Sequence, residues 1–334
     1  MHQRLFFCCL VILLIFTGIQ CRQPKRVYHF TRFSMDTIVE YTLLAPDRSV
    51  ALAAVNAAHQ EVERLDSLFW EENPNSPIYQ VNQIHHSVTV PDTIFQFLQR
   101  VRQYWQITGG LFDPSIKPVL DLYQLDAQSP VPPDSQQINS VLPLVGFQQF
   151  SLQPRRRIVK QHAHNALTLG GVAKGYIVDR AVAILKQYGI TGGIVNAGGD
   201  LKCWRNDHRY WHIGIQHPRK STILAVLKLQ NGAVATSGDY QRFYIFKGKR
   251  YHHLIDPRNG RPGRLSQSAT VIATTTEMAD AMATAAFLMG ASKAMQWANQ
   301  RPDIHVLLVD ASGTLHISHG MQNYLLEVDQ NEVP

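Results

Sequence analysis

A long series of short apolar runs, with no helical segment between them, restricts the fold more strongly than any other feature. The series covers residues 193–273. Strands that follow one another directly are joined by hairpins, whereas parallel strands need a long crossover, which is usually a helix. Amphipathic segments with helical spacing lie outside the series, at 50–69, 92–105, 170–189 and 277–289. The sequence therefore predicts an α+β protein with mixed or antiparallel sheets, not a regularly alternating α/β fold.

Other local patterns add further elements to this prediction. Asp92 is expected to cap the helix that follows it, Gly109-Gly110 to end that helix, and Gly189 to end a later one. A Ser/Pro-rich loop at 128–134 precedes a short helix. Strands are expected at 38–44, around Phe150 and Ile158, and at 193–196, 211–215, 223–229, 243–246, 251–255, 269–273, 304–309 and 314–317.

The first twenty residues have the pattern of a targeting signal. A basic residue precedes the apolar run at 5–16, which suits a signal peptide and is too short for a membrane span. Cys21 follows Gly18-Ile19-Gln20 and indicates cleavage with lipid attachment. Ordinary cleavage nearby and an uncleaved anchor are the alternatives. We therefore expect an exported protein with a signal peptide at 1–20, a linker at 21–33 and one domain at 34–330.

Composition and charge exclude several classes of protein. With 45% hydrophobic and 17% charged residues, the chain is typical of globular proteins. The net charge of +7 suits an anionic small ligand or an anionic membrane surface. Nucleic acid is not an expected partner, because the basic residues are scattered and the longest block, 155–157, has no interleaved aromatic residues. Outside the leader only Cys21 and Cys203 remain, which predicts neither a disulfide framework nor a zinc site.

Glycines at the start of a predicted helix form the densest unusual segment, residues 169–176. We expect them to follow a strand, in a turn where backbone amides could approach a phosphate at the positive end of the helix. The segment is not a known nucleotide fingerprint: Gly170 and Gly175 have Walker spacing but Tyr176 replaces the lysine. A tight turn with close packing would explain the glycines equally well.

Three other segments carry side chains suited to chemistry. Gly198-Gly199 precedes the carboxylate of Asp200 at a strand end, although a plain β-turn explains it equally well. Asp280 and Thr284 are four residues apart on one helix face and offer hard oxygen atoms, which suit Mg²⁺ completed by phosphates and water. A buried Asp bonded to a Thr is the simpler alternative. Strand alternation sends His252 and His253 to opposite faces, so that one could act as a general base in a pocket, or both could be ordinary surface and core residues.

Taken together and in this order, these segments resemble the ApbE family of flavin transferases. Members of that family are exported, often lipid-anchored, magnesium-dependent enzymes. The resemblance implies transfer of FMN from FAD to a Ser or Thr hydroxyl of an acceptor protein, with release of AMP. The matching blocks are Ser34-Met35-Asp36-Thr37, Gly109-Gly110-Leu111-Phe112-Asp113-Pro114, residues 169–179, residues 196–201, Ala235-Thr236-Ser237-Gly238-Asp239-Tyr240, residues 253–260 and Ala279-Asp280-Ala281-Met282-Ala283-Thr284.

The resemblance also implies a role for individual residues. Asp280 and Thr284 would be side-chain ligands of Mg²⁺ and Ala173 a backbone ligand, and Mn²⁺ would suit the same oxygen atoms. His253 would be the general base, beside an open groove for the acceptor. The residues expected to line the FAD site, between two lobes, are Met35, Trp70, Leu111, Phe112, Asp113, Gly170, Lys174, Asp200 and Ser237.

Thr168 departs from the family pattern, because relatives usually have Asp at this position. A polar contact to the flavin or around the metal is therefore expected to be weaker or rearranged. This departure favours one alternative function, an exported lipoprotein that binds FAD without transfer. A second alternative is hydrolysis of FAD to FMN and AMP at the same metal site. For the transferase, the family suggests an acceptor in a periplasm-facing subunit of an electron-transfer complex, and a lipid anchor at Cys21 on the periplasmic side of the inner membrane.

Overall fold

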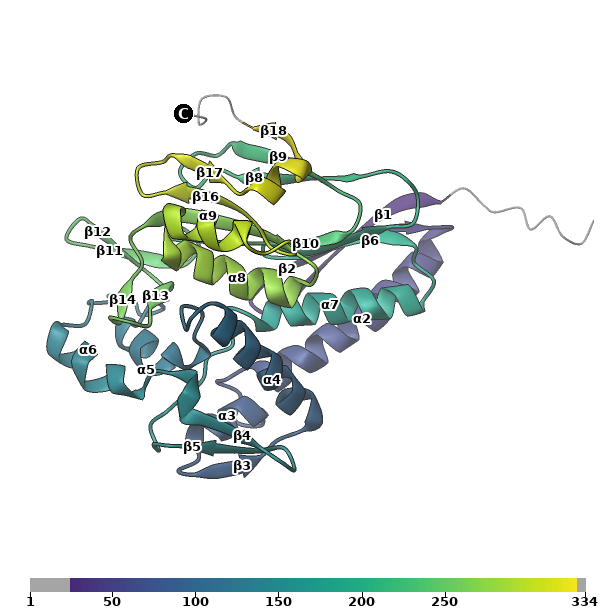
Figure 1. Ribbon diagram of the computed structural model, residues 1–334. Coiled ribbons are helices and arrows are strands. Elements are labelled where there is room, and N and C mark those ends of the chain that lie inside the picture. Colours follow the sequence, from purple (N-terminus) through teal and green to yellow (C-terminus); the bar gives the residue numbers. More distant parts are fainter. Residues whose placement is uncertain (1–24, 329–334) are drawn as a thin grey trace, which may run out of the picture.

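The computed structural model describes residues 25–328 and shows a mixed helix and sheet protein (Figure 1). The predicted signal peptide and the candidate lipidation site Cys21 lie outside the described residues. No helix within residues 25–328 combines the length and the hydrophobicity that crossing a membrane requires. The α+β prediction is confirmed, because every strand pairing in the described region is antiparallel.

An eight-stranded antiparallel sheet forms the centre of the molecule. In its order β1-β2-β6-β7-β10-β15-β16-β17, four of the seven neighbouring pairs are strands that are consecutive in the chain. Three of the pairs, β1-β2, β6-β7 and β16-β17, are hairpins, and longer segments of chain join the others. The strands are β1 (Arg26–Ser34), β2 (Thr37–Ala45), β6 (Gly192–Ala197), β7 (Asp200–Arg205), β10 (Gly232–Gly238), β15 (Ser266–Ala273), β16 (His305–Asp310) and β17 (Leu315–Ile317).

The two faces of this sheet are covered by different elements (Figure 1). Helices α2 (Arg48–Phe69), α7 (Ala173–Gln187) and α8 (Thr276–Met289) pack on one face, and α9 (Ala291–Asn299) follows α8 directly. A three-stranded sheet covers the other face, where its apolar residues form a smaller core with those of the central strands. Its strands are β8 (Trp211–Gln216), β9 (Ile223–Leu229) and β18 (Leu325–Val328), and a 3-10 helix, η6 (His319–Tyr324), precedes the last of them.

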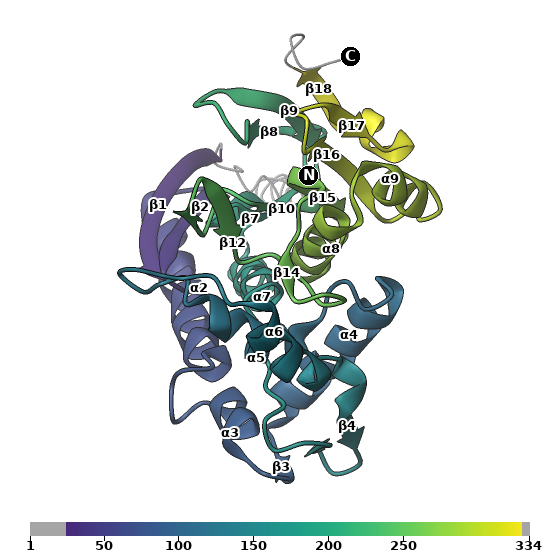
Figure 2. The ribbon, with the colours of Figure 1, turned by 90° about the vertical axis from the view of Figure 1, so that its left-hand side faces the viewer.

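A second part of the molecule is built from the chain between α2 and α7 (Figure 2). It contains α3 (Pro77–Gln83), α4 (Asp92–Ile107), α5 (Lys117–Leu120), α6 (Ser135–Val141) and short 3-10 turns. Its small sheet joins β3 (Ser87–Thr89), β5 (Arg157–Lys160) and β4 (Phe150–Gln153). Two hairpins from the later chain also stand near it: β11 (Phe243–Phe246) with β12 (Lys249–His252), and β13 (Ile255–Asp256) with β14 (Arg261–Pro262).

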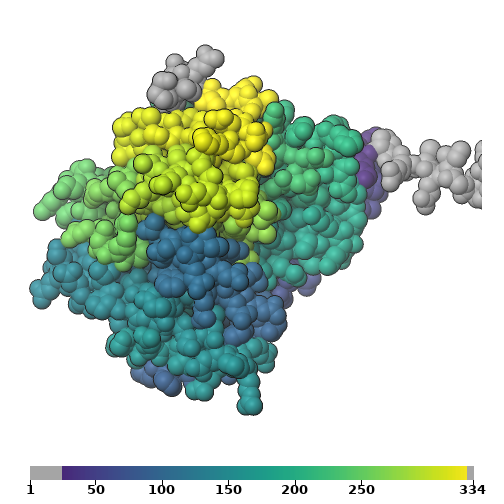
Figure 3. All heavy atoms as spheres, viewed as in Figure 1, coloured from purple at the N-terminus to yellow at the C-terminus, as the bar shows by residue number. Residues whose placement is uncertain are grey.

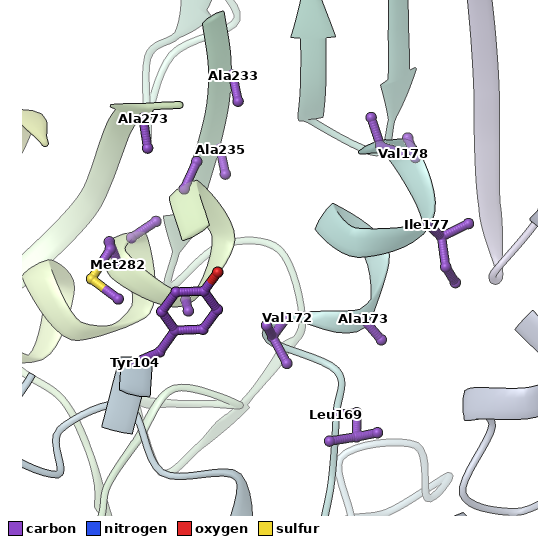
Figure 4. Packing of buried hydrophobic residues seen from close by; sticks show 14 of the residues in the cluster. Tyr104, Leu169, Val172, Ala173, Ile177, Val178, Ala233, Ala235, Ala273 and Met282 are labelled. Atoms are coloured by element: carbon purple, nitrogen blue, oxygen red, sulfur yellow. The ribbon is translucent and has the colours of Figure 1, made fainter. Parts of the chain in front are cut away.

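One apolar core joins this second part to the helices of the main sheet. Figure 4 shows Tyr104 of α4, Val172 before α7 and Met282 of α8 turned toward the same interior. On the sheet side the core residues are small, such as Ala235 and Ala273, so α8 lies close to β10 and β15. In the space-filling view the blue segment lies directly against the green and yellow segments (Figure 3).

Several expectations from the sequence need correction. The predicted linker at 21–33 is wrong for most of its length, because residues 26–34 form β1 and pair along their whole length with β2. Asp92 is the first residue of α4 rather than its cap, since the N-cap is Pro91. The strand expected at 251–255 is interrupted, because the chain bends at His253 before β13 begins.

Candidate active site

The glycine segment before α7 lies against α8 and Phe112. An added Cβ on Gly171 would stand 3.5 Å from the Thr284 hydroxyl oxygen and 3.6 Å from the Phe112 ring. Residues 161–172 form no strand, so the prediction that these glycines follow a strand is wrong. The loop instead runs straight into α7 at Ala173. It therefore brings three of the predicted site segments to one place.

Close crossing of α7 and α8 fixes the position of Asp280. An added Cβ on Gly175 would lie 2.4 Å from the carbonyl oxygen of Thr276, so only glycine permits this approach. The Gly175 N–H points to Asp280 Oδ2 at 3.4 Å. One turn later on α7, Asp179 accepts hydrogen bonds from the Thr276 hydroxyl and the Glu277 N–H, both at 3.0 Å. The start of α8 is thus bound to α7, and Asp280 faces the first turn of α7.

Two acidic side chains and one lysine form the charged centre of the site. Lys174 Nζ donates to Asp200 Oδ2 at 2.5 Å. Burial opposes protonation of Lys174, but the nearby charges of Asp200 and Asp280 outweigh it and raise the lysine pKa. Burial, together with the charge of Asp200, raises the pKa of Asp280 well above its usual value, against the opposing effects of Lys174 and the Gly175 N–H. Additional positive charge beside Asp280 would therefore favour its ionised form.

The predicted metal ligands fit a hard divalent cation. Asp280, Thr284 and the Ala173 carbonyl offer only oxygen atoms, which suits Mg²⁺ or Mn²⁺. Within residues 25–328 no group of three or more His, Cys, Asp or Glu side chains is arranged to hold a metal by itself. A magnesium ion held by one carboxylate and completed by phosphates and water needs no such cage. The buried Asp280, whose charge is only partly balanced by Lys174, is the observation that fits such an ion.

Two hairpin tips stand together at one end of the central sheet. The β1-β2 turn places Met35 and Asp36 at φ values of 55° and 53°, and the β6-β7 turn places Gly198 and Gly199 at 60° and 102°. An added Cβ on Gly198 would lie 2.7 Å from Thr37 Oγ1, so the two tips are in contact. The second turn leads directly into Asp200 at the start of β7. The glycine pair therefore is a β-turn, and it also delivers the carboxylate that holds Lys174.

Ser237 near the end of β10 lies beside Thr284, because its hydroxyl oxygen is 3.2 Å from Thr284 Oγ1. Two residues later, Asp239 accepts two hydrogen bonds from Arg219, at 2.7 and 2.6 Å, and one from Arg250 at 3.0 Å. The sequence analysis assigned no role to Asp239 or to these arginines. For Asp239 the sequence offers one signal of a role, its position after Gly238 in a matching block. For Arg219, which is distant in the chain, it offers no such signal.

His253 is held in one tautomer by the backbone. Its Nδ1 lies 3.3 Å from the Arg242 carbonyl oxygen, and its backbone N–H donates to the same oxygen at 3.2 Å. A carbonyl can only accept, so Nδ1 carries the proton and Nε2 carries the lone pair. Burial, aided by the positive charges of Arg242 and Lys174, lowers the pKa of His253 to about 4, although the carbonyl contact works against this shift. The ring is therefore neutral at physiological pH.

The carboxylate of Asp113 faces protein donors. It accepts hydrogen bonds from the Ser115 N–H and hydroxyl at 2.9 and 2.6 Å, from Trp105 Nε1 at 2.9 Å and from the Phe147 N–H at 3.3 Å. These contacts fix the turn that carries Phe112, which is buried, next to Gly171. Asp113 therefore acts on the site through the position of its neighbours.

Trp70 and Leu111 take different places. Trp70 is 53% exposed at the end of α2, whereas Leu111 is partly buried against the main core. The residue after Trp70, Glu71, reaches the glycine loop instead. Its Oε2 accepts the Leu169 N–H at 3.1 Å.

Glu71 is a site residue that the sequence analysis missed. Its Oε1 lies 3.5 Å from Lys117 Nζ, and the Thr168 side chain also donates to this carboxylate. Burial raises the pKa of Glu71, while Lys117, Thr168 and the Leu169 N–H partly offset that effect. Thr168 thus contacts a buried carboxylate at the base of the glycine loop. An acidic residue following the end of a helix gave no signal of this role.

Comparison with known proteins identifies relatives over most of the chain. The profile of the ApbE family matches residues 35–308. An FAD:protein FMN transferase of Klebsiella pneumoniae is 28% identical over 300 residues, which cover 88% of this chain and 92% of that protein. One of Treponema pallidum is 26% identical over 261 residues and covers 72% of each chain.

Solved structures share the fold. The ApbE protein of Thermotoga maritima superimposes with a TM-score of 0.85 and 27% identity, over 90% of this chain and 100% of that one. The flavin transferase ApbE of Vibrio cholerae gives a TM-score of 0.79 at 23% identity, over 90% of this chain and 100% of that one. The mixed helix and sheet architecture is therefore that of these proteins.

Proposed function

The chain belongs to the ApbE family, and we propose that it transfers FMN from FAD to a Ser or Thr hydroxyl of an acceptor protein. Its curated relatives carry the name FAD:protein FMN transferase. One structural observation supports the proposal most directly: Asp280 and Thr284 face the glycine segment and Lys174, beside the buried Phe112. Oxygen ligands, a cation and an apolar wall in one place suit a flavin joined to a pyrophosphate.

The reaction exchanges one phosphorus–oxygen bond for another. The acceptor hydroxyl oxygen attacks the phosphorus of the FMN half of FAD, and the bond from this phosphorus to the bridging oxygen breaks. AMP leaves with the bridging oxygen, and FMN remains on the acceptor as a phosphoester. His253 Nε2 takes the proton of the attacking hydroxyl, while the Arg242 carbonyl keeps the proton on Nδ1 and orients the ring.

The charged centre stabilises the leaving group. Lys174, anchored to Asp200, offers a fixed positive charge near the pyrophosphate. Asp280, Thr284 and the Ala173 carbonyl would hold Mg²⁺, or Mn²⁺ in its place. When bound, such an ion supplies charge neutralisation at the phosphate oxygens. The partly unbalanced charge of Asp280 supports this assignment.

The apolar part of the site would receive the flavin ring system. Phe112 is buried beside Gly171, and Met35 and Leu111 are partly buried against the main core. The positive φ of Met35 follows from the two-residue hairpin, which turns this residue out of the sheet. Gly170 of the loop and Ser237 of β10, which contacts Thr284, would complete the FAD site. Trp70, which is 53% exposed, would be a further neighbour of the flavin.

The test is direct transfer in a defined mixture. The chain without its leader is incubated with FAD, Mg²⁺ and a flavin-acceptor domain, and the products are followed by intact mass and by in-gel flavin fluorescence after denaturation. We expect an FMN adduct on the acceptor and an equal amount of AMP, and we expect both to disappear with a chelator. The absence of an adduct with every acceptor tried would overturn the proposal.

Two other outcomes of this experiment identify the alternative functions. Intact FAD that copurifies with the protein, without any AMP, would indicate a flavin-binding lipoprotein. Free FMN and AMP without an adduct would indicate hydrolysis, with water in the position of the acceptor hydroxyl. The contact between Thr168 and Glu71 argues against a site weakened by the missing Asp, because a carboxylate is present at the same loop.

We further propose that the chain is exported and works on the periplasmic side of the inner membrane, anchored by a lipid at Cys21. The apolar leader and its cysteine support this location. The acceptor would then be a periplasm-facing subunit of an electron-transfer complex. Metabolic labelling with a radioactive fatty acid tests the anchor: we expect the label on the wild-type chain and none on Cys21→Ser, and an unlabelled wild-type chain would refute it.

A further inference from the structure

The β11-β12 hairpin stands apart from the other sheets. Its two strands pair only with each other, from Phe243 with His252 to Phe246 with Lys249. Lys247 and Gly248 form the tip, at φ values of 48° and 74°. Figure 1 shows the hairpin projecting from the body of the molecule. Tyr251 and His252 attach the base of the hairpin to the body, since Tyr251 packs against a small core cluster and His252 is buried. The exposed side chains nearer the tip are free to serve another purpose.

Exposed apolar side chains lie on one face of this hairpin. Ile245 is 57% exposed and Phe243 is 38% exposed, and they are two residues apart on the same strand. Arg250 is the cross-strand partner of Ile245, and its guanidinium lies 4.3 Å from the centre of the Phe243 ring. The face therefore combines apolar surface with positive charge.

The hairpin has strong positive charge and no acidic residue between 241 and 252. Arg242 is paired with Asp126 and Arg250 with Asp239, so both arginines are held by the body of the molecule. Lys247 and Lys249 differ, because no carboxylate lies within ion-pair distance of either one in the part of the chain that the structure describes. Two unbalanced lysines at the end of a projecting hairpin favour a partner with negative charge.

The hairpin also leads directly into the proposed general base. Arg242 directly precedes β11, and its carbonyl oxygen is the atom that holds both the backbone N–H and Nδ1 of His253. A protein that brings a hydroxyl to His253 Nε2 must therefore approach close to the hairpin. A membrane lying flat on the same residues would cover the approach to His253, so the geometry favours a protein partner.

We propose that this hairpin is the docking surface for the acceptor protein. In this arrangement an acidic surface of the acceptor lies against Lys247 and Lys249, and an apolar side chain of the acceptor covers Ile245. The inference rests on the proposed transferase function and adds the part of the molecule that recognises the protein substrate. It separates the chemical step at His253 from acceptor recognition on β11 and β12.

The experiment compares hairpin variants with matched exposed sites elsewhere. The test variants are Lys247→Glu with Lys249→Glu, and Ile245→Ser. The controls are Lys293→Glu on the exposed face of α9, and Ile223→Ser on β9, where the isoleucine is 58% exposed. The probe is the soluble flavin-acceptor domain of a sodium-translocating electron-transfer complex, chosen for a net negative charge.

We expect the double lysine variant to raise the KM for the acceptor domain about tenfold, because charge pairs at a rim mainly affect encounter and partner choice. The kcat at saturating acceptor and the dissociation constant for FAD stay at wild-type values. The increase in KM of the wild-type enzyme with salt is weakened or reversed in the variant, since two glutamates repel an acidic surface and salt screens that repulsion. Ile245→Ser raises the same KM several-fold without changing its salt dependence.

Several results would overturn this proposal. An unchanged acceptor KM, or an equal change in the controls, would show that the hairpin does not recognise the acceptor. If the double lysine variant no longer sediments with phosphatidylglycerol vesicles but keeps the wild-type KM for the acceptor, the hairpin binds lipid instead of the acceptor. If the wild-type enzyme forms no adduct, the proposed function itself fails. Binding of the acceptor domain, measured without FAD by surface plasmon resonance, then still tests docking, and equal affinities of wild type and double variant would refute it.

Discussion

At the scale of single residues, the state of His253 is set by its surroundings. Burial and nearby positive charges lower its pKa from 6.5 to about 4. Protonation of the ring, which abolishes its action as a base, therefore requires a pH well below neutrality. We expect kcat/KM for transfer to fall with an acid limb near pH 4 rather than near 6.5, since this parameter reports groups of the free enzyme. A pH–rate profile measures this acid limb, with a separate control for the stability of the acceptor at each pH. An acid limb at pH 6.5 would contradict the assignment of His253 as the base.

The same shift has a consequence for stability. Because the folded pKa of His253 lies below that of the unfolded chain, the unfolded chain binds the proton first as pH falls. The contribution of the neutral ring is thus complete above pH 6.5 and declines between 6.5 and about 4. Replacing His253 should therefore weaken this part of the acid dependence of unfolding, which denaturant titrations at several pH values would detect.

Removal of the His253 ring should affect transfer far more than flavin binding. We expect His253→Ala to lower the transfer rate by roughly 10²- to 10⁴-fold, the usual effect of losing a general base. The FAD dissociation constant, measured by flavin fluorescence, should stay close to that of the wild type. His319→Ala, at an exposed histidine on η6, serves as the control. Equal losses of binding and transfer would mean that His253 holds the flavin rather than the proton.

We expect the Asp280 carboxylate to bind the metal ion but to lower the stability of the metal-free protein. Its raised pKa means that the ionised carboxylate destabilises the folded chain: this cost is complete above the raised pKa, declines as pH falls below it and is gone below the ordinary value of 3.8. We expect Asp280→Asn to leave the melting temperature without metal unchanged or higher. The rise in melting temperature on adding Mg²⁺ should be lost, because only the folded wild type binds the ion. Differential scanning fluorimetry with Asp303→Asn as control measures both, and a retained magnesium shift in Asp280→Asn would remove this residue from the metal site.

At the scale of elements, the crossing of α7 and α8 determines whether the site exists. Gly175→Ala would place a methyl group against the Thr276 backbone, and we expect a loss of about 1–3 kcal/mol in unfolding free energy, the usual cost of overpacking. Magnesium affinity should also fall, since Asp280 lies one turn into α8. Gly170→Ala is the matched control for stability, because its Cβ would meet only Thr168 Oγ1 at 3.8 Å. Equal melting temperatures for Gly175→Ala and the wild type would refute the close crossing.

The sequence predicts the long elements of this fold because their patterns are local. The apolar stripes of α2, α4, α7 and α8 repeat at helical spacing, so these helices are found where expected. β10 was missed because its residues, Gly-Ala-Val-Ala-Thr-Ser-Gly, are mostly small and become strand only between β7 and β15. The sequence does not reveal β1, because an edge strand needs few buried residues, and only Phe30 and Ser34 are buried there.

The site residues, like the elements, can be predicted only where the pattern is local. Motif residues such as Asp280, Lys174 and His253 could be selected from the sequence because their blocks match a family pattern. Their partners could not, because the contacts join distant parts of the chain. Glu71 lies 98 residues from Leu169, and Arg219 reaches Asp239 from the loop between β8 and β9. Only the folded chain brings such pairs together.

At the scale of the whole molecule, the shared core predicts one cooperative unit. Phe97 and Ile158 of the second part belong to the same apolar cluster as Val39 and Val271 of the central sheet. We therefore expect a single unfolding transition, with equal calorimetric and van't Hoff enthalpies and coincident fluorescence and circular dichroism curves. Two separate transitions in scanning calorimetry would show that the two parts unfold independently.

The start of the folded unit provides the final test. β1 pairs with β2 over nine residues and buries Phe30. We expect a chain that begins at residue 25 to melt like the leaderless chain that begins at residue 21. A chain that begins at residue 35 should lose roughly 3 kcal/mol or more, from the buried phenylalanine and the lost strand pairing. It should also aggregate, because β2 then becomes an open edge that carries Tyr41 and Leu43, both buried in the intact protein. Denaturant unfolding and light scattering measure the two effects, and a chain starting at residue 35 with wild-type stability would mean that these residues are a linker after all.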